Sequence, residues 1–357
     1  MRILQICTQM ESGGAQRVAM ILAREFRTRG HRVNTLFLYR KTYAFAGETG
    51  VLTMYPRKPS LLERIILPFR LLRIIQRTRP DVVITHTYFA NVIGQFIATI
   101  AGIRSRIAVA HSMLNRYPWH VRIADLILGT IGCYSHHVFV SRSAAAPSAF
   151  YPHSYKSRIR IIYNGIHPAD HGEVDVISVR RRWRLPEEGA LVINVGRLSH
   201  VKNQKAILQA IAEIPNVHVV VVGTGDLRND LESCAGELGI SERVHLIGEA
   251  SNEEVRALLR ASDVFVFPSY FEAMPLAVIE AMAAGLPIVA ADIESLREVA
   301  GNVALYVAPE DSKALAASIR SLLEDQGMAK ELGRQAVIRA TKFTVNRMAD
   351  EYENLFA

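Results

Sequence analysis

The chain has 357 residues, which exceeds one ordinary hydrophobic core and suits two domains of roughly 150 to 200 residues each. Half of the residues are hydrophobic and 21% are charged, and three widely spaced cysteines argue against a disulfide framework or a cysteine zinc site. Residues 1–170 hold 23 basic and 7 acidic side chains (+16), whereas residues 171–357 hold 19 and 27 (−8), so the first half is expected to meet an anionic partner such as nucleic acid or a membrane.

The first half alternates strands and helices. Residues 2–8 are predicted to be a buried strand, and residues 17–29 an amphipathic helix that ends at Gly30. Further strands are predicted at 31–39, 81–85, 106–110, 137–141 and 160–163. The N-terminus has the pattern of a strand and not of a secretory signal, and no apolar run reaches the roughly 20 residues of a spanning helix, so we expect a cytoplasmic protein.

The second half starts the alternation again. Its strands are predicted at 191–195, 217–222, 244–247, 264–267 and 287–290. Continuous Val and Ile runs between helices indicate parallel sheets that are covered on both faces. We therefore predict an α/β fold with two Rossmann-like, doubly wound domains that face each other across a cleft, because such sheets bind ligands beyond the carboxyl ends of their strands.

Two loops after predicted strands of the second half carry cations and glycines. The segment GRLSHVKN places Gly196, Arg197 and Lys202 at a strand-to-helix turn, where two cations suit a diphosphate, although a solvated basic loop explains them equally well. The segment GTGDLRNDL places Gly223 and Gly225 in a turn that permits close approach of the backbone to a ligand. An ordinary tight turn is the alternative interpretation.

The segment FEAMPLAVIEAMAAGLPIVA, residues 271–290, sets two carboxylates in apolar surroundings. Residues 276–284 are predicted to be a helix that ends at Gly285 and whose N-terminus attracts phosphate. Glu272 then lies in the preceding loop and Glu280 in the helix, where a carboxylate accepts hydrogen bonds from paired hydroxyls. The alternative is a helix-capping Glu272 and a salt-bridged Glu280, but apolar neighbours leave few internal partners.

These motifs resemble a known family. The segment EAMPLAVIE followed by AMAAGLPIVA is similar to the signature of the retaining GT-B glycosyltransferases of family four (glycosyl transferases group 1), which usually reads EGFGLxxxEAMAxGxPVVA. The resemblance extends over essentially the whole chain through SGGAQR, YNGI, GRLxxxKN, GxGxL and ASDVFVFPS. It implies the GT-B fold and transfer of a sugar from a nucleotide-sugar.

The resemblance also implies roles for single residues. Arg197 and Lys202 are expected to bind the donor diphosphate, Glu280 the ribose hydroxyls and Glu272 the hydroxyls of the transferred sugar. His111, directly after a predicted strand, matches the family's active-site histidine that contacts this sugar. The expected catalytic residues are thus His111, Arg197, Lys202 and Glu272. The expected donor-binding residues are Gly13, Gly14, Gly196, Gly223, Gly225, Ala273, Met274, Pro275, Leu276 and Glu280.

One departure from the family pattern concerns the loop after Glu272. Ala273, Met274 and Pro275 stand where the family has Gly-Phe-Gly, which makes the loop stiffer and puts the identity of the donor sugar in question. No Asp-x-Asp metal motif follows a suitable strand, so we expect no metal and no cofactor. Two cations and a helix N-terminus would then stabilise the leaving diphosphate.

We expect three segments: residues 1–168 as the acceptor-binding domain, 169–340 as the nucleotide-sugar-binding domain and 341–357 as a helix that crosses back to the first domain. In the basic half, Arg70, Arg73 and Arg77 fall on one predicted helical face. This face is expected to contact an anionic membrane if the acceptor is lipid-linked, which would place the protein on the inner face of the cytoplasmic membrane. A solvated helix face is the alternative.

The expected function is transfer of a hexosyl or N-acetylhexosaminyl unit from a UDP-sugar, or second from GDP-mannose, to a saccharide or lipid-linked saccharide in bacterial surface polysaccharide or glycolipid synthesis. The alternatives are a GT-B sugar-nucleotide epimerase, which needs acid and base groups but no acceptor, and a non-catalytic protein that binds an anionic ligand. A nicotinamide-dependent oxidoreductase would need a full glycine fingerprint followed by an acidic residue, and this sequence does not contain one. Nucleic acid is not an expected partner, because no aromatic residues interleave with the cations on a recognisable module.

Overall fold

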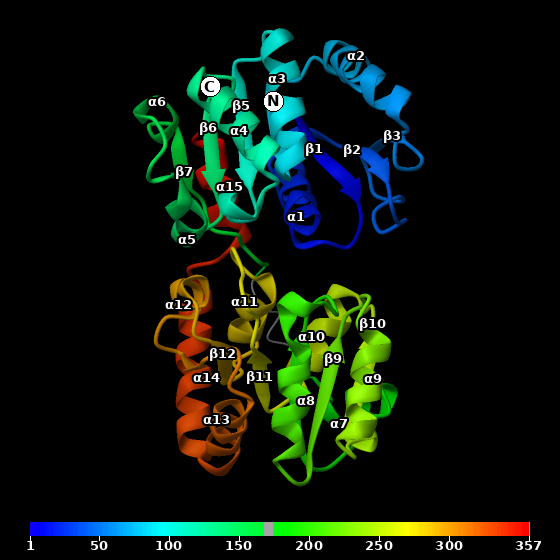
Figure 1. The fold of residues 1–357 in the computed structure, drawn as a ribbon, viewed down its shortest axis with the longest axis vertical. Coiled ribbons are helices and arrows are strands. Elements are labelled where there is room, and N and C mark those ends of the chain that lie inside the picture. Colours follow the sequence, from blue (N-terminus) through cyan, green and yellow to red (C-terminus); the bar gives the residue numbers. More distant parts are fainter. Residues whose placement is uncertain (168–173, 357) are drawn as a thin grey trace. The chain divides into compact units, whose positions relative to one another are not determined.

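The computed structural model describes residues 1–167 and 174–356. The chain divides into two compact units, one formed by Met1–Ile166 with Thr344–Ala357 and the other by His167–Phe343 (Figure 1). The domain boundary expected between residues 168 and 169 lies outside the described residues. Each unit carries one sheet of parallel strands, as the sequence predicts.

The first unit has a seven-stranded sheet. In sheet order its strands are β3 (Val51–Tyr55), β2 (Arg32–Arg40), β1 (Arg2–Met10), β4 (Val82–His86), β5 (Ser105–Ala110), β6 (His136–Phe139) and β7 (Ile159–Ile161). The sequence pattern does not predict β3, because this short edge strand is only partly buried and lacks a continuous apolar run.

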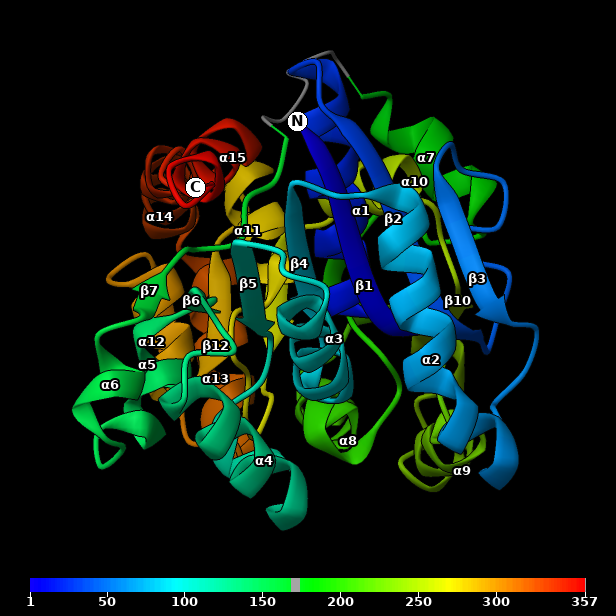
Figure 2. The ribbon, with the colours of Figure 1, turned by 90° about the horizontal axis from the view of Figure 1, so that it is seen from above.

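The helices of the first unit cover both faces of the sheet. They are α1 (Gly14–Thr28), α2 (Leu61–Thr78), α3 (Tyr88–Ile100), α4 (Trp119–Thr130), α5 (Arg142–Ala145), α6 (His153–Lys156) and α15 (Val345–Glu353). On one face α2 and α3 pack on Leu4 and Ile6 of β1, and on the other α1 packs on Cys7 and its neighbours (Figure 2). Successive β1 side chains alternate between these faces, as in any strand.

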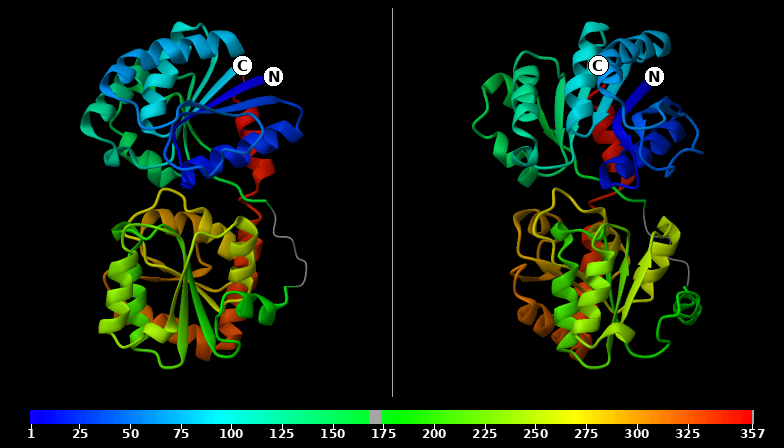
Figure 3. Two further views of the ribbon diagram at one scale, coloured as in Figure 1. Left: turned by 90° about the vertical axis from the view of Figure 1, so that its right-hand side faces the viewer. Right: turned by 45° about the vertical axis from the view of Figure 1, so that its right-hand side comes forward.

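The last helix, α15, belongs to the first unit and packs against α1 (Figure 3). Arg29 at the end of α1 donates hydrogen bonds to Asp350 at 2.5 Å and to Glu353 at 2.8 Å. The rings of Phe26 and Phe356 lie 5.5 Å apart. Apolar contacts and ion pairs together therefore fix the end of the chain on the first unit.

The second unit has a six-stranded sheet with the order β10 (Val244–Gly248), β9 (Val217–Val222), β8 (Ala190–Val195), β11 (Val264–Phe267), β12 (Ile288–Ala291) and β13 (Ala304–Val307). Its helices are α7 (Val176–Arg182), α8 (Gln204–Ala212), α9 (Arg228–Glu237), α10 (Asn252–Arg260), α11 (Leu276–Ala283), α12 (Glu294–Ala300), α13 (Ser312–Glu324) and α14 (Gln326–Ala340). The sequence pattern does not predict β13, which is short and lies at the edge of the sheet. Chain order reverses between β8 and β11, and such a switch point is where doubly wound sheets bind ligands.

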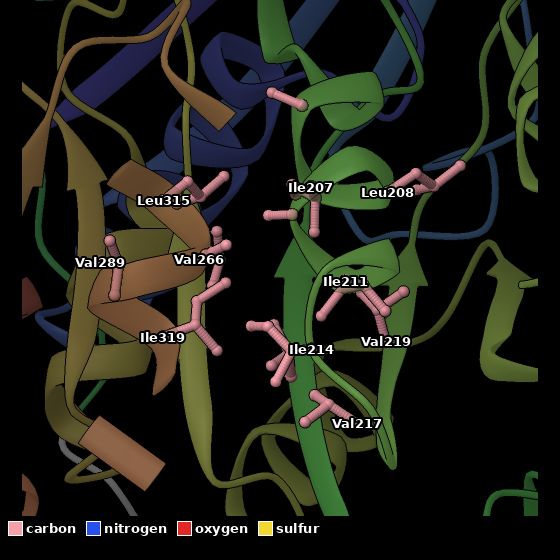
Figure 4. Packing of buried hydrophobic residues seen from close by; sticks show 14 of the residues in the cluster. Ile207, Leu208, Ile211, Ile214, Val217, Val219, Val266, Val289, Leu315 and Ile319 are labelled. Atoms are coloured by element: carbon pink, nitrogen blue, oxygen red, sulfur yellow. The ribbon is translucent and has the colours of Figure 1, made fainter. Parts of the chain in front are cut away.

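The core of the second unit lies between the sheet and helices α8 and α13 (Figure 4). Ile207 and Ile211 of α8 and Ile319 of α13 are buried against Val219 and Val266 of the strands. Burial of an aliphatic side chain contributes roughly 1.5–3 kcal/mol, so this layer fixes the strands whose carboxyl ends carry the loops described next.

Candidate active site

Three loops of the second unit meet at the carboxyl edge of its sheet. They follow β8, β9 and β11, which are neighbours in the sheet. The first carries Arg197 and Lys202, the second Gly223 and Gly225, and the third Glu272. Parallel strands end at the same edge, so sequence segments some 75 residues apart come together here.

Lys202 and Glu272 form an ion pair at the centre of this cluster. The Lys202 Nζ lies 2.5 Å from Glu272 Oε1 and 4.8 Å from the centre of the Phe267 ring. The side chains are only 20% and 12% exposed, so the pair is screened by water less than a surface ion pair is. The structure therefore brings together one cation and one carboxylate that were predicted from separate motifs.

Backbone and side-chain contacts hold the loops that carry this pair. The amide of Tyr270 donates to the carbonyl of Val201 at 2.9 Å, and the His200 and Tyr270 rings stack. Asn203, in the left-handed conformation with φ 52°, donates from its side chain to Pro309 O at 2.7 Å. Asn203 is part of the KN pair in the sequence motif, but its structural role becomes apparent only from this backbone conformation.

The predicted glycines pack one loop against another. The amide of Leu198 donates to the carbonyl of Thr224, and a Cβ atom on Gly225 would overlap the carbonyl of Leu198. A Cβ atom on Gly223 would overlap the carbonyl of Gly196, and Gly223 has φ 141°. Contact between the protein's own loops therefore accounts for Gly223 and Gly225, whether or not a ligand also approaches them.

The loop after Glu272 leads directly into α11. Ala273, Met274, Pro275 and Leu276 are buried, and the helix begins at Leu276 with Pro275 as its N-cap. The N-cap residue is thus Pro275 and not Glu272, and it makes no side-chain capping hydrogen bond.

Glu280 lies within α11 and is 7% exposed. Arg197, by contrast, is exposed in the loop after β8, and its carbonyl accepts a 2.9 Å hydrogen bond from the side chain of Gln204. Arg197 therefore lies in one of the three loops at the carboxyl edge of the sheet, whereas Glu280 lies in the helix that follows the third loop.

The remaining predicted site residues lie in the first unit. Gly13 is the N-cap of α1, and a Cβ atom on Gly14 would meet nothing within 4 Å. His111 follows β5, and its Nε2 lies 2.9 Å from Nδ1 of His86. His86 Nε2 in turn lies 2.7 Å from Gln5 Oε1. Gln5 and His86 carry no signal in the sequence, because each lies inside an apolar strand.

Burial governs the ionisation of the histidine pair. It lowers the pKa of His111 to about 3, and burial with the neighbouring His111 ring lowers the pKa of His86 well below its usual value. Both rings are therefore neutral near pH 7. They can act as hydrogen-bonding groups but not as cations.

The basic face expected on α2 is exposed. Arg70, Arg73 and Arg77 are all exposed, and Arg70 lies over the Tyr55 ring at 4.9 Å. No described helix is both long enough and apolar enough to span a bilayer. Nor does the described part of the chain contain a cluster of three or more His, Cys, Asp or Glu side chains suited to a metal ion.

Two family models match successive parts of the chain. Residues 12–170 match the model for glycosyltransferase family 4, and residues 175–339 match that for glycosyl transferases group 1. The lipopolysaccharide core biosynthesis glycosyltransferase LpsD of Rhizobium meliloti is 27% identical over 96% of this chain and 95% of its own. Over shorter segments, an uncharacterised glycosyltransferase of Methanocaldococcus jannaschii is 27% identical (56% of this chain, 54% of its own) and the 2-deoxystreptamine glucosyltransferase of Streptomyces kanamyceticus 32% identical (47% and 46%). The chain thus spans about half the length of these two curated relatives.

Solved structures show the same fold. The Anabaena protein HepE, solved with UDP and glucose, superposes with a TM-score of 0.86 at 20% identity over 99% of this chain and 98% of its own. The two parallel-sheet α/β units thus match those of GT-B glycosyltransferases. Together with the two family models, this similarity shows that the chain belongs to the glycosyl transferases group 1, family 4, of GT-B fold.

Proposed function

We propose that this protein is a retaining, metal-independent glycosyltransferase. It transfers a hexosyl or N-acetylhexosaminyl unit from a nucleotide-sugar to a saccharide or lipid-linked saccharide. The donor that we propose first is a UDP-sugar, and the second choice is GDP-mannose. The observation that carries the proposal is the Lys202–Glu272 pair at the switch point of a sheet in the group 1 unit. The UDP and glucose bound to HepE support the choice of donor, and the lipopolysaccharide role in the name of LpsD supports surface polysaccharide or glycolipid synthesis.

The chemistry follows from the charges that develop. Breaking the bond between sugar and phosphate leaves negative charge on the diphosphate, which Lys202 and Arg197 stabilise together with the amides at the start of α11. Glu272 has further lone pairs besides those that meet Lys202, so it can also accept hydrogen bonds from sugar hydroxyls. Glu280 receives the ribose hydroxyls. The acceptor hydroxyl attacks the same face of the sugar, and its proton passes to the departing phosphate.

The deciding experiment is a donor panel measured with and without acceptors. UDP-glucose, UDP-galactose, UDP-N-acetylglucosamine and GDP-mannose are incubated with purified protein and with saccharide or lipid-linked saccharide acceptors. We expect release of nucleotide diphosphate that depends on the acceptor, a product with the anomeric configuration of the donor, and no effect of EDTA. Conversion of the sugar-nucleotide without an acceptor would establish the epimerase instead, and an inverted product would contradict retention.

The outward face of α2 supports contact with an anionic lipid surface. Leu61 is 77% exposed, Leu62 73%, Ile65 68% and Phe69 70%, so the first half of the helix presents apolar side chains to solvent. The exposed Arg70, Arg73 and Arg77 follow in its second half. Apolar side chains that enter a headgroup layer beside cations that pair with anionic lipids are the two requirements of interfacial helix binding. This placement suits a lipid-linked acceptor.

A further inference from the structure

A chain of hydrogen bonds runs from α1 through the sheet to His111. The Gln5 side-chain nitrogen donates to the carbonyl of Ala19 at 3.0 Å, Gln5 Oε1 meets His86 Nε2 at 2.7 Å, and His86 Nδ1 meets His111 Nε2 at 2.9 Å. Gln5 and His86 are fully buried, whereas His111 is only partly buried. This series of hydrogen bonds therefore leads from the interior of the first unit to its surface.

The strand register explains why these side chains meet. Cys7 of β1 pairs with His86 of β4, and His86 pairs with Val109 of β5. Alternate residues of a strand share a face, so Gln5 lies on the same face as Cys7, and His111 follows Val109 by two positions. This is the face that α1 covers, which is why the carbonyl of Ala19 is within reach.

The direction of each hydrogen bond follows from the first. A carbonyl oxygen can only accept, so the nitrogen of the Gln5 amide points to Ala19 and its oxygen points to His86. His86 Nε2 must then carry a proton, and the neutral ring leaves Nδ1 as an acceptor. His111 must therefore donate from Nε2, which leaves its own Nδ1 with a lone pair. Among the described residues no donor contacts this atom.

We propose that Gln5 and His86 are positioning residues that hold His111 in the Nε2–H tautomer, so that His111 Nδ1 accepts a hydrogen bond from a hydroxyl of the sugar substrate. The inference rests on the proposed function for the identity of that hydroxyl. The fixed tautomer itself rests on the contacts and on the neutrality of both rings. Low pKa values of both rings agree with it, because each ring must be neutral for the directions to hold.

The second unit contains a matched control. His218 Nδ1 lies 3.1 Å from His245 Nε2, and the two rings stack with centres 5.4 Å apart, much like the 5.2 Å of His86 and His111. Within the described chain this second pair is not extended by a third side chain. A substitution there changes a similar histidine contact and leaves the hydrogen bonds between Gln5, His86 and His111 unaltered.

The test is the tautomer of His111, read from long-range ¹H–¹⁵N correlations of the full chain labelled at histidine. We expect Nε2–H in the native protein, loss of the single tautomer in Gln5→Leu and His86→Leu, and its return in His86→Asn, because the Asn oxygen takes the place of Nδ1. His218→Asn leaves the His111 signals unchanged. A native His111 protonated at Nδ1 overturns the inference whatever the variants do.

Turnover of the donor that the donor panel identifies gives the second readout. Gln5→Leu and His86→Leu should lower kcat about tenfold, with a smaller change in KM, because one neutral hydrogen bond to the reacting sugar is misplaced. His86→Asn should recover most of this loss. The control His218→Asn should leave kcat unchanged. Equal kcat in His86→Leu and the native protein, with a melting temperature that shows both folded, would refute the positioning role.

Failure of the proposed function gives a different pattern. The native protein would then turn over no nucleotide-sugar in the donor panel while His111 still showed the Nε2–H tautomer. In that case the hydrogen-bond chain stands and the assignment of a sugar hydroxyl to His111 is wrong.

Discussion

The two units use charge in different ways. In the second unit the charges of the candidate site, Lys202 and Glu272, lie inside a cluster of loops at the ends of strands. In the first unit the corresponding group, His111 with His86, is neutral, and the exposed arginines of α2 lie on the outer surface. A charge excess in a sequence therefore points to a surface, whereas the chemistry of a site depends on where single side chains are buried.

The largest effect that would test this comparison is loss of the partly buried cation Lys202. Lys202→Ala should lower kcat/KM at least about 100-fold, or ~3 kcal/mol, since it leaves diphosphate charge without its partner in a partly dry site. Lys205→Ala, which removes an exposed cation three residues along the chain, is the matched control and should have little effect. Steady-state kinetics with the identified donor measure both, and equal losses would show that Lys202 has no special role.

Glycines of the two units should respond differently to the same change. Gly223→Ala should destabilise the protein by about 2 kcal/mol, because the added Cβ overlaps the Gly196 carbonyl and the backbone is at φ 141°. Gly14→Ala meets open space at the start of α1 and should change stability by less than about 0.5 kcal/mol, while weakening donor binding if this helix approaches the donor. Chemical denaturation and donor titration separate these effects. A destabilised Gly14→Ala would contradict the open space there.

The two glutamates should separate binding from turnover. Glu280→Ala should raise the donor dissociation constant about tenfold with a smaller change in kcat, because its hydroxyl contacts are made in ground and transition states alike. Glu272→Ala should mainly lower kcat, because Glu272 meets Lys202 and acts close to the reacting sugar. Calorimetric titration and initial rates provide the comparison, and normal kinetics in both variants would show that the site is assigned wrongly.

The sequence predicts most strands of both sheets, and it singles out Lys202 and Glu272, which the structure brings together, for a physical reason. Buried parallel strands are continuous apolar runs, and Lys202 and Glu272 lie in loops whose composition departs from those runs. The short edge strands β3 and β13 are partly buried and lack this signal.

Gln5 and His86 could not be predicted because their partners are set by strand register and not by spacing along the chain. The exposed apolar residues of α2 were likewise not apparent, since a Leu-rich helix is ordinarily expected to bury them.

The smallest effect per residue concerns the basic face of α2. Each exposed arginine near an anionic surface contributes roughly 1 kcal/mol, so Arg70, Arg73 and Arg77 act together and only a combined change is expected to be measurable. The native protein should sediment with vesicles that contain phosphatidylglycerol, should not sediment with neutral vesicles, and should be released by salt. Changing all three arginines to Glu should abolish sedimentation and leave donor affinity unchanged, because these residues lie outside the loops of the second unit.

A control with the same change in net charge distinguishes a local face from general attraction. It replaces three exposed cations of the second unit with Glu: Arg256, Lys313 and Lys330. This variant should still sediment, because the cations of α2 and the exposed Leu62 and Phe69 beside them remain. Phe69→Ser should weaken sedimentation even in low salt, since the apolar contribution is not screened. Equal binding to neutral vesicles, or none to either kind, would leave a soluble or protein-bound acceptor as the better interpretation of the first unit.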